Sequence, residues 1–169
     1  MYNFGRYILF FITYSVIGTI AETLFRLITE HQLYGVHGFL SLPIFPIYGF
    51  GALLILLIYR RFKNPVMLFF VSIVLMVALE FFAHLLIEAI FNVRIWDYGD
   101  SPFSIHGRVR LDTAIGFGIA ALLLVYVIHP KIKKLVERIP KKVSIIFAVL
   151  ATTILVTNII FSIYMRFTW

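Results

Sequence analysis

Five long apolar runs dominate this chain and make a membrane protein the natural reading. They cover approximately residues 7–28, 43–59, 65–91, 111–129 and 143–165. A helix needs roughly 20 mostly apolar residues to cross a bilayer, and the second run is the shortest of the five. The sequence therefore predicts an all-α, polytopic transmembrane helix bundle of about five helices.

The composition supports this prediction. Hydrophobic residues make up 62% of the 169 residues, only 14% are charged, and the mean hydropathy is +0.99. Soluble domains carry about 25% charged residues, so a soluble core of this length would not bury so much apolar surface. We expect residues 1–169 to form a single integral membrane domain. The first run lacks a small-residue cleavage site, so we expect a retained helix rather than a signal peptide.

Basic residues gather in the loops on one side of the predicted membrane. Positively charged loops stay in the cytoplasm, so we expect the amino terminus inside and the carboxyl terminus outside. The net charge of +7 then reflects topology and contact with membrane lipids, and we expect no nucleic-acid partner. The ten inner cations are Arg6, Arg60, Arg61, Lys63, Lys131, Lys133, Lys134, Arg138, Lys141 and Lys142, and the four outer ones are Arg94, Arg108, Arg110 and Arg166.

The start of the second run is interrupted by proline and glycine. Pro43 and Pro46 precede Tyr48 and Gly49, a pattern that predicts a kinked or partly re-entrant entry with unpaired backbone groups. Such interruptions line binding sites in some membrane proteins, which makes Pro46, Tyr48 and Gly49 ligand-loop candidates. Helix initiation explains the prolines nearly as well.

The third run carries three ionisable residues at helical spacing. Glu80, His84 and Glu88 stand at i, i+4 and i+8 and therefore share one face of a helix. A charged group at the centre of a bilayer costs about 2.5–3.5 kcal/mol on insertion scales. Three readings stay open at this point: a proton- or ion-paired cluster, a divalent-metal site, and a hydrogen-bond network that only packs helices.

The first run adds the carboxylate of Glu22, which we expect to lie at a depth in the membrane similar to that of Glu80. Glu22 and Arg26 are four residues apart and can form an ion pair along the helix. Alternatively, Arg26 extends toward the interface and leaves Glu22 to face Glu80 across the bundle. All acids except Glu137 fall in the outer half or the outer loops of the predicted topology, so we expect any polar site to open outward.

The outer loop between the third and fourth runs holds further candidates. Trp96 and Tyr98 are suited to the membrane interface, and Asp97 between them has Arg94, Arg108 and Arg110 as potential partners. Arginines in such a loop can clamp a carboxylate or phosphate headgroup bidentately. Alternatively, the acids and arginines tie the loop down. We favour a functional role for Asp97 and Arg108, and loop attachment for Asp100 and Arg110.

Several strings together resemble one bacterial membrane family. They are Tyr14-Ser15-x-x-Gly18-x-x-x-Glu22, Pro46-Ile-Tyr48-Gly49-Phe-Gly51-Ala, Leu79-Glu80 with Glu88, Trp96-Asp97-Tyr98, and Gly107-Arg108. In this order they are similar to the family of ABC-transporter type IV permeases, the CmpB-like proteins. The resemblance runs from about Tyr14 to Pro130 and leaves out the fifth run. It implies transport in a bacterial cytoplasmic membrane.

Three classes of function follow from these observations. The first is a permease-like transport component with an outward-facing polar site; its ATPase would be a separate subunit, because the chain has no Gly-x-x-x-x-Gly-Lys-[Ser/Thr] sequence for ATP. The second is an intramembrane enzyme acting on a lipid or lipid-linked substrate by acid–base or metal-assisted chemistry. The third is a structural or regulatory membrane partner. Glu80→Gln distinguishes the third, which predicts a change in stability alone.

Overall fold

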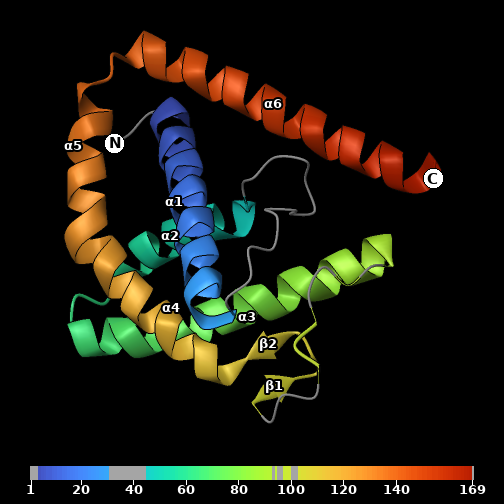
Figure 1. The fold of residues 1–169 in the computed structure, drawn as a ribbon. Helices are drawn as coiled ribbons and strands as arrows, with labels where there is room; N and C mark the ends of the chain where they lie inside the picture. The colour runs from blue at the N-terminus through green and yellow to red at the C-terminus, as the bar shows by residue number, and fades with distance from the viewer. Residues whose placement is uncertain (1–3, 31–44, 93, 95–96, 100–102, 169) are drawn as a thin grey trace. The chain divides into compact units, whose positions relative to one another are not determined.

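The protein is almost entirely helical in a computed structural model that describes residues 4–30, 45–92, 94, 97–99 and 103–168 (Figure 1). Its helices are α1 (Phe4–Glu30), α2 (Pro46–Tyr59), α3 (Pro65–Phe91), α4 (Leu111–Leu123), the π-helical segment η1 (Leu124–Ile128), α5 (His129–Arg138) and α6 (Lys141–Thr168). Two short strands, β1 (Ser104–Ile105) and β2 (Val109–Arg110), form a hairpin between α3 and α4. The predicted all-α class is confirmed.

Four helical segments of the described chain are long and apolar enough to cross a membrane. They are Phe4–Phe25, Pro65–Phe91, Ala114–Arg138 and Lys141–Phe161. The second predicted span is a helix of only 14 residues that starts at Pro46, about 21 Å at the usual rise per residue against a hydrocarbon core of about 30 Å. Pro43 lies outside the described residues. The in–out orientation stays a prediction.

The basic segment after the fourth predicted span is a helix, so the prediction of a loop at this place was wrong. α4, η1 and α5 follow one another without a break, so Lys131, Lys133, Lys134, Glu137 and Arg138 lie on a helix. Lysine, arginine, leucine and glutamate are good helix formers, and Lys133 Nζ lies 3.9 Å from Glu137 Oε1 one turn away. The π-helical turn ends at Ile128, two residues before Pro130, a residue that lacks the N–H of a regular α-helix.

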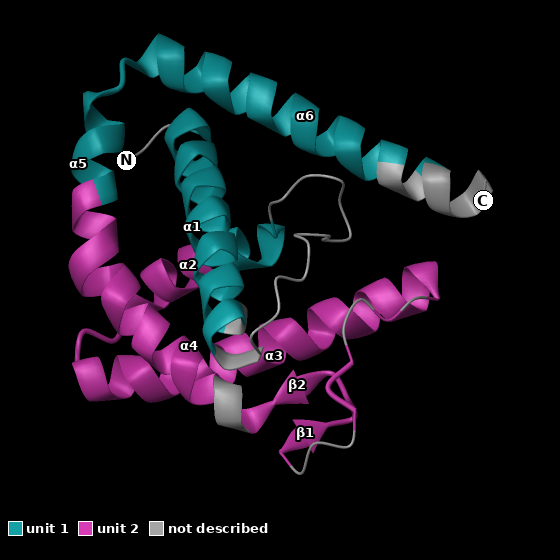
Figure 2. Ribbon diagram, viewed as in Figure 1, with its two compact units in different colours: residues 1–50, 132–169 teal, residues 51–131 magenta. Residues whose placement is uncertain are grey.

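The chain divides into two compact units (Figure 2). Unit 1 contains residues 1–50 and 132–169, and unit 2 contains residues 51–131. One integral membrane domain stays a prediction.

In unit 1, α1 and the start of α2 meet through small residues. A Cβ atom at Gly18 would overlap the side chain of Tyr48, and one at Gly49 would stand 2.6 Å from the carbonyl oxygen of Phe11. Thr19 reinforces the contact, because its hydroxyl accepts the Phe45 N–H at 2.9 Å near the amino-terminal end of α2. Small residues allow helix backbones to approach closely within a membrane.

Another close contact in unit 1 joins the first turns of α1 and α6. A Cβ atom at Gly5 would lie 2.8 Å from the carbonyl group of Ser144. Beside it, the Arg6 guanidinium donates to the carbonyl oxygens of Glu137 at 3.1 Å and Ile139 at 3.4 Å. A cation at this place satisfies carbonyls that the end of α5 leaves without helical partners.

Unit 2 is built on the contact between α3 and α4. Its buried side chains include Leu68 and Met76 of α3 and Ala114 and Ala121 of α4. Asn64 caps α3 by accepting the N–H groups of two residues in the first turn, which fixes where the helix begins.

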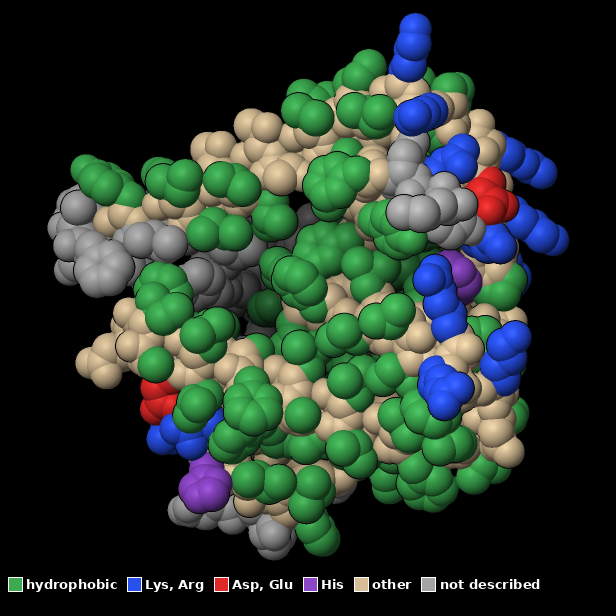
Figure 3. Space-filling view, turned by 180° about the vertical axis from the view of Figure 1, so that it is seen from behind, with side chains coloured by type: hydrophobic (Ala, Val, Ile, Leu, Met, Phe, Trp, Pro, Cys, Tyr) green, Lys and Arg blue, Asp and Glu red, His purple; other side chains and the backbone are tan. Residues whose placement is uncertain are grey.

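Large hydrophobic side chains remain on the outside of both units. Figure 3 shows them spread over the face in view, and more than half of the side chain is exposed at positions such as Val74, Phe82, Ile146 and Phe161. Exposed apolar surface of this extent is expected where lipid, rather than water, surrounds the helices.

The α1–α2 contact predicts that an alanine at Gly49 destabilises the protein. Gly49→Ala inserts a methyl group against Phe11 and Ser15, and overpacking of this kind costs about 1–3 kcal/mol. Gly116→Ala is the matched control, since among the described residues its Cβ position has no neighbour within 4 Å apart from its adjoining residues and the backbone of its own helix. Thermal unfolding in detergent should show a lower midpoint for Gly49→Ala alone; equal midpoints would contradict the close contact.

Candidate functional site

The three ionisable residues of α3 share one face, as predicted, and differ in burial. Glu80 is 8% exposed and His84 1% exposed, whereas the Glu88 side chain is 26% exposed. The spacing of four residues places them one above another along the helix. The stripe therefore runs from a buried carboxylate near the middle of α3 to an accessible one near its end.

The hairpin that follows α3 was not predicted. Strand β1 pairs antiparallel with β2 in the register Ser104↔Arg110 and Ile105↔Val109. His106 and Gly107 in the turn have φ of 53° and 72°, and the Arg108 N–H donates to the Ile105 carbonyl at 3.0 Å. Positive φ at both central residues is the mark of a tight hairpin turn. His106-Gly107 was the signal in the sequence, but it is weaker than the usual Asn-Gly.

The segment Asp97–Gly99 lies along this turn. The Tyr98 N–H donates to the Gly107 carbonyl at 2.9 Å, and Asp97 Oδ1 accepts the Gly99 N–H at 2.9 Å. A side chain at Gly107 would overlap the Asp97 carboxylate, so glycine is required there by space as well as by its positive φ. We call residues 97–99 and 103–110 together the hairpin strap.

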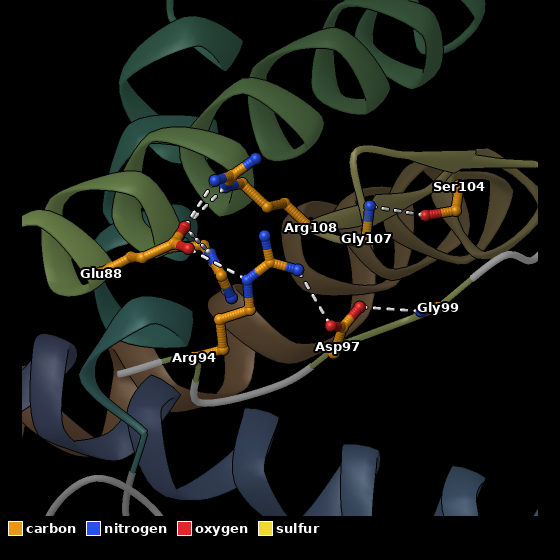
Figure 4. A network of polar contacts seen from close by, with 8 residues as sticks. Glu88, Arg94, Asp97, Gly99, Ser104, Gly107 and Arg108 are labelled. Carbon is orange, nitrogen blue, oxygen red and sulfur yellow. Dashed lines mark hydrogen bonds and ion pairs between the residues drawn. The ribbon is translucent and has the colours of Figure 1, made fainter. Parts of the chain in front are cut away.

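Two arginines hold the carboxylate of Glu88 (Figure 4). Arg108 of the hairpin strap donates from Nε at 3.1 Å and from Nη2 at 2.5 Å to Glu88 Oε2. Arg94 donates from Nε to Glu88 Oε1 at 3.0 Å and from Nη1 to Asp97 Oδ2 at 2.9 Å. Two guanidinium groups thus face two carboxylates, and the formal charges of the four residues cancel.

The hairpin strap also contacts the buried end of the stripe. The Tyr98 hydroxyl donates to Glu80 Oε1 at 3.0 Å. Between the two attachments, His84 Nδ1 lies 3.7 Å from Glu88 Oε2. The Arg108 guanidinium also lies over the Phe81 ring, 5.9 Å from its centre. The strap is therefore fastened to α3 at both carboxylates.

Electrostatics favour ionised groups at the exposed end of the cluster. Hydrogen bonds from the Gly99 N–H and from Arg94 hold the pKa of Asp97 below its usual value of 3.8. Hydrogen bonds to Glu88 and Asp97 raise the pKa of Arg94. Both shifts stabilise the charged forms that make the ion pairs.

The structure brings together Glu80, His84, Glu88, Asp97, Tyr98 and Arg108 from the predicted candidates. It adds Arg94, which was considered only as a partner of Asp97; its position six residues after Glu88 and three before Asp97 was the available signal. Arg110 lies over the Tyr98 ring, 5.9 Å from its centre, in keeping with loop attachment.

Other candidates belong elsewhere or lie outside the described part. Tyr48 and Gly49 form the contact with α1, and Pro46 begins α2. Glu22 is half-buried in α1 of unit 1, and its approach to Glu80 stays a prediction. Trp96, Asp100 and the side chain of Arg26 lie outside the described residues.

The hypothesis of a divalent-metal site gains no support from the arrangement of the described carboxylate and imidazole groups. Among described residues, no three His, Asp or Glu side chains are placed to hold a metal ion. Both oxygens of Glu88 instead accept hydrogen bonds from arginines. Chemically, the arrangement offers two guanidinium groups that bind carboxylate oxygens.

The bond between Tyr98 and Glu80 predicts a measurable loss of stability. Tyr98→Phe removes a donor from a buried carboxylate, and such changes cost about 1–3 kcal/mol. In the control Tyr126→Phe, a hydroxyl loses its 3.2 Å bond to the Lys63 carbonyl and its contact with Tyr59, but no buried carboxylate loses a donor. Thermal unfolding in detergent should separate the two variants; similar midpoints would mean that the Glu80 bond adds nothing.

The lowered pKa of Asp97 predicts an acid-sensitive strap. A carboxyl group with a lowered pKa stabilises the folded state above its unfolded-state pKa and stops doing so as the pH falls through its folded-state pKa. Protection of the hairpin strap against hydrogen exchange, corrected for intrinsic rates, should therefore exceed that of Asp97→Asn at about pH 6. The difference should shrink only as the pH falls below 3.8 and should vanish once the pH has passed below the lowered folded-state pKa of Asp97. A difference that persists in acid would refute this role for Asp97.

Comparison with known proteins agrees with the resemblance seen in the sequence. No curated protein and no solved structure matches the chain. A family model described as "Putative ABC-transporter type IV" matches residues 9–163. This match reaches into α6, so the expectation that the fifth run lies outside the family was wrong. Because the match covers most of the chain, this multi-pass membrane protein belongs to the family described as "Putative ABC-transporter type IV".

Proposed function

We propose that the chain is a permease-like transport component whose hairpin strap closes an outward-facing polar site on α3. The observation that carries this proposal is the fastening of one loop to both carboxylates of the stripe, Tyr98 to Glu80 and Arg108 to Glu88. Family membership supports a role in transport. Ionisable residues within membrane segments commonly mark the paths of substrates, ions or protons.

The hairpin strap has the properties of a gate. Its contacts with the two carboxylates of α3 are hydrogen bonds and ion pairs, which water or a charged solute can replace, while Val109 and Ile105 supply the apolar contacts of the strap. Opening would expose His84 and Glu80 to the outer side in the predicted orientation. ATP hydrolysis would come from a separate ATPase subunit, and the proposed location is the bacterial cytoplasmic membrane.

An intramembrane enzyme acting on a lipid-linked substrate is the second candidate. It is favoured by an apolar groove of about 410 Å³ beside Phe81, the residue on which the Arg108 guanidinium lies. In that reading, Glu80 supplies acid–base chemistry and the lipid portion of the substrate occupies the groove.

ATP-driven solute exchange in membrane vesicles from producing cells tests the transport proposal. Vesicles with the native chain should accumulate or lose a solute, identified by mass spectrometry, that vesicles without the chain do not. Glu80→Gln should abolish most of this difference, because it removes the ionisable group at the buried end of the stripe.

Glu137→Gln is the matched control, since it makes the same chemical change on the exposed face of α5 and should retain exchange. Identical solute profiles with and without the chain would refute the proposal. A changed lipid composition that depends on Glu80, without solute exchange, would favour the enzyme.

A further inference from the structure

Glu88 occupies the place of a ligand. Its carboxylate accepts three hydrogen bonds from two guanidinium groups, two from Arg108 and one from Arg94. Arginine forks of this kind are how proteins bind free carboxylates and phosphates. The two arginines follow α3 in the chain, whereas Glu88 belongs to α3 itself. The arginines therefore bind Glu88 as they would bind a separate anionic ligand.

We propose that Arg94 and Arg108 form an anion-binding site that Glu88 holds closed, and that the ligand of this site carries a carboxylate or phosphate group. The inference rests on the proposed function, because it names the ligand class of the same site. An incoming anion displaces the Glu88 carboxylate from Arg108 and thereby releases the hairpin strap from the end of α3.

The charges around the arginines suit such an exchange. Asp97 remains bound to Arg94 through Nη1, so that one guanidinium stays oriented while its Nε changes partner. Without Glu88, the two arginines and Asp97 carry a net charge of +1, which an anion neutralises. The exposed fractions of 26% for Glu88 and 45% for Arg94 allow the anion to approach from outside.

An apolar groove begins beside the same arginine. It is lined by α3 side chains between Ile73 and Phe81, together with Ile105 of β1 and Leu111 of α4. Arg108 lies over Phe81 at one end, and the groove follows α3 away from the charged cluster for about 12 Å at the helical rise. The anion therefore has two sources: a free solute, or the headgroup of a lipid whose acyl chain lies in the groove.

Anion binding to the purified full-length chain tests the proposal. Glu88→Gln keeps the shape of the side chain and removes the charge that competes with a ligand. Inorganic phosphate, titrated by calorimetry in detergent, should bind this variant roughly tenfold or more tightly than it binds the native chain, because a competing internal ligand lowers apparent affinity. Phosphate should also raise the thermal midpoint of Glu88→Gln more than that of the native chain.

Two controls make the result specific. Glu137→Gln removes the same charge from an exposed pair with Lys133 and should bind phosphate no better than the native chain. Adding Arg108→Gln to Glu88→Gln should abolish the gained binding. Phosphate affinity that is equal in the native chain, Glu88→Gln and Glu137→Gln, or a gain that survives Arg108→Gln, would overturn the proposal.

A lipid arm distinguishes the two sources. Phosphatidic acid and phosphatidylcholine with the same acyl chains are titrated into the delipidated Glu88→Gln variant and followed by native mass spectrometry. If the ligand is a lipid, phosphatidic acid should bind roughly tenfold more tightly than inorganic phosphate, and Ala78→Phe, which fills the groove, should remove only that advantage. Ala120→Phe on an exposed face of α4 is the control. Equal affinity for both probes assigns the site to a free solute.

Glu88→Asp keeps the proposal testable if Glu88→Gln does not fold. The shorter carboxylate retains its charge but reaches both arginines less well, so phosphate affinity should lie between those of the native chain and a released site; no gain over the native chain would count against the proposal. Anion binding without solute exchange in vesicles would leave this inference standing while refuting transport.

Discussion

The ion pairs around Glu88 determine how the end of α3, the hairpin strap and the start of α4 are held together. A carboxylate on a membrane helix is costly unless cations neutralise it, and here two guanidinium groups do so. The turn at His106-Gly107 places Arg108. A hydrogen bond from the Tyr98 N–H to the Gly107 carbonyl ties that turn to the Asp97–Gly99 segment. A change at any of these residues therefore affects the attachment of the whole loop.

The hairpin strap is attached to α3 at Glu80 and at Glu88, and the two attachments differ in how deeply they are buried. At the Glu88 end, the ion pairs are partly exposed. At the Glu80 end, Tyr98 donates to a carboxylate that is only 8% exposed, where loss of a hydrogen-bond donor is costly. The attachment at Glu80 is thus more deeply buried than the attachment at Glu88.

The α1–α2 contact shows how the same sequence motif admits a functional and a structural explanation. Pro46, Tyr48 and Gly49 looked like a ligand loop because proline and glycine interrupt the run. In the structure, Tyr48 and Gly49 pack against Gly18 and Ser15, so their residue types are explained by close helix packing. The basic stretch around Lys133 was predicted to be a loop because of its charge. It forms α5 instead, in keeping with its helix-forming residues and the Lys133–Glu137 spacing of one helical turn.

The sequence by itself determined the helical membrane class, the span at residues 65–91 and the shared face of Glu80, His84 and Glu88, because hydropathy and helical periodicity are local properties. The sequence also suggested three arginines as partners of Asp97, but it did not indicate which of them binds. Only the tertiary structure selected Arg94 for Asp97 and both Arg94 and Arg108 for Glu88. That choice depends on the hairpin turn, which brings together residues twenty positions apart, and no periodicity in the sequence encodes such a contact.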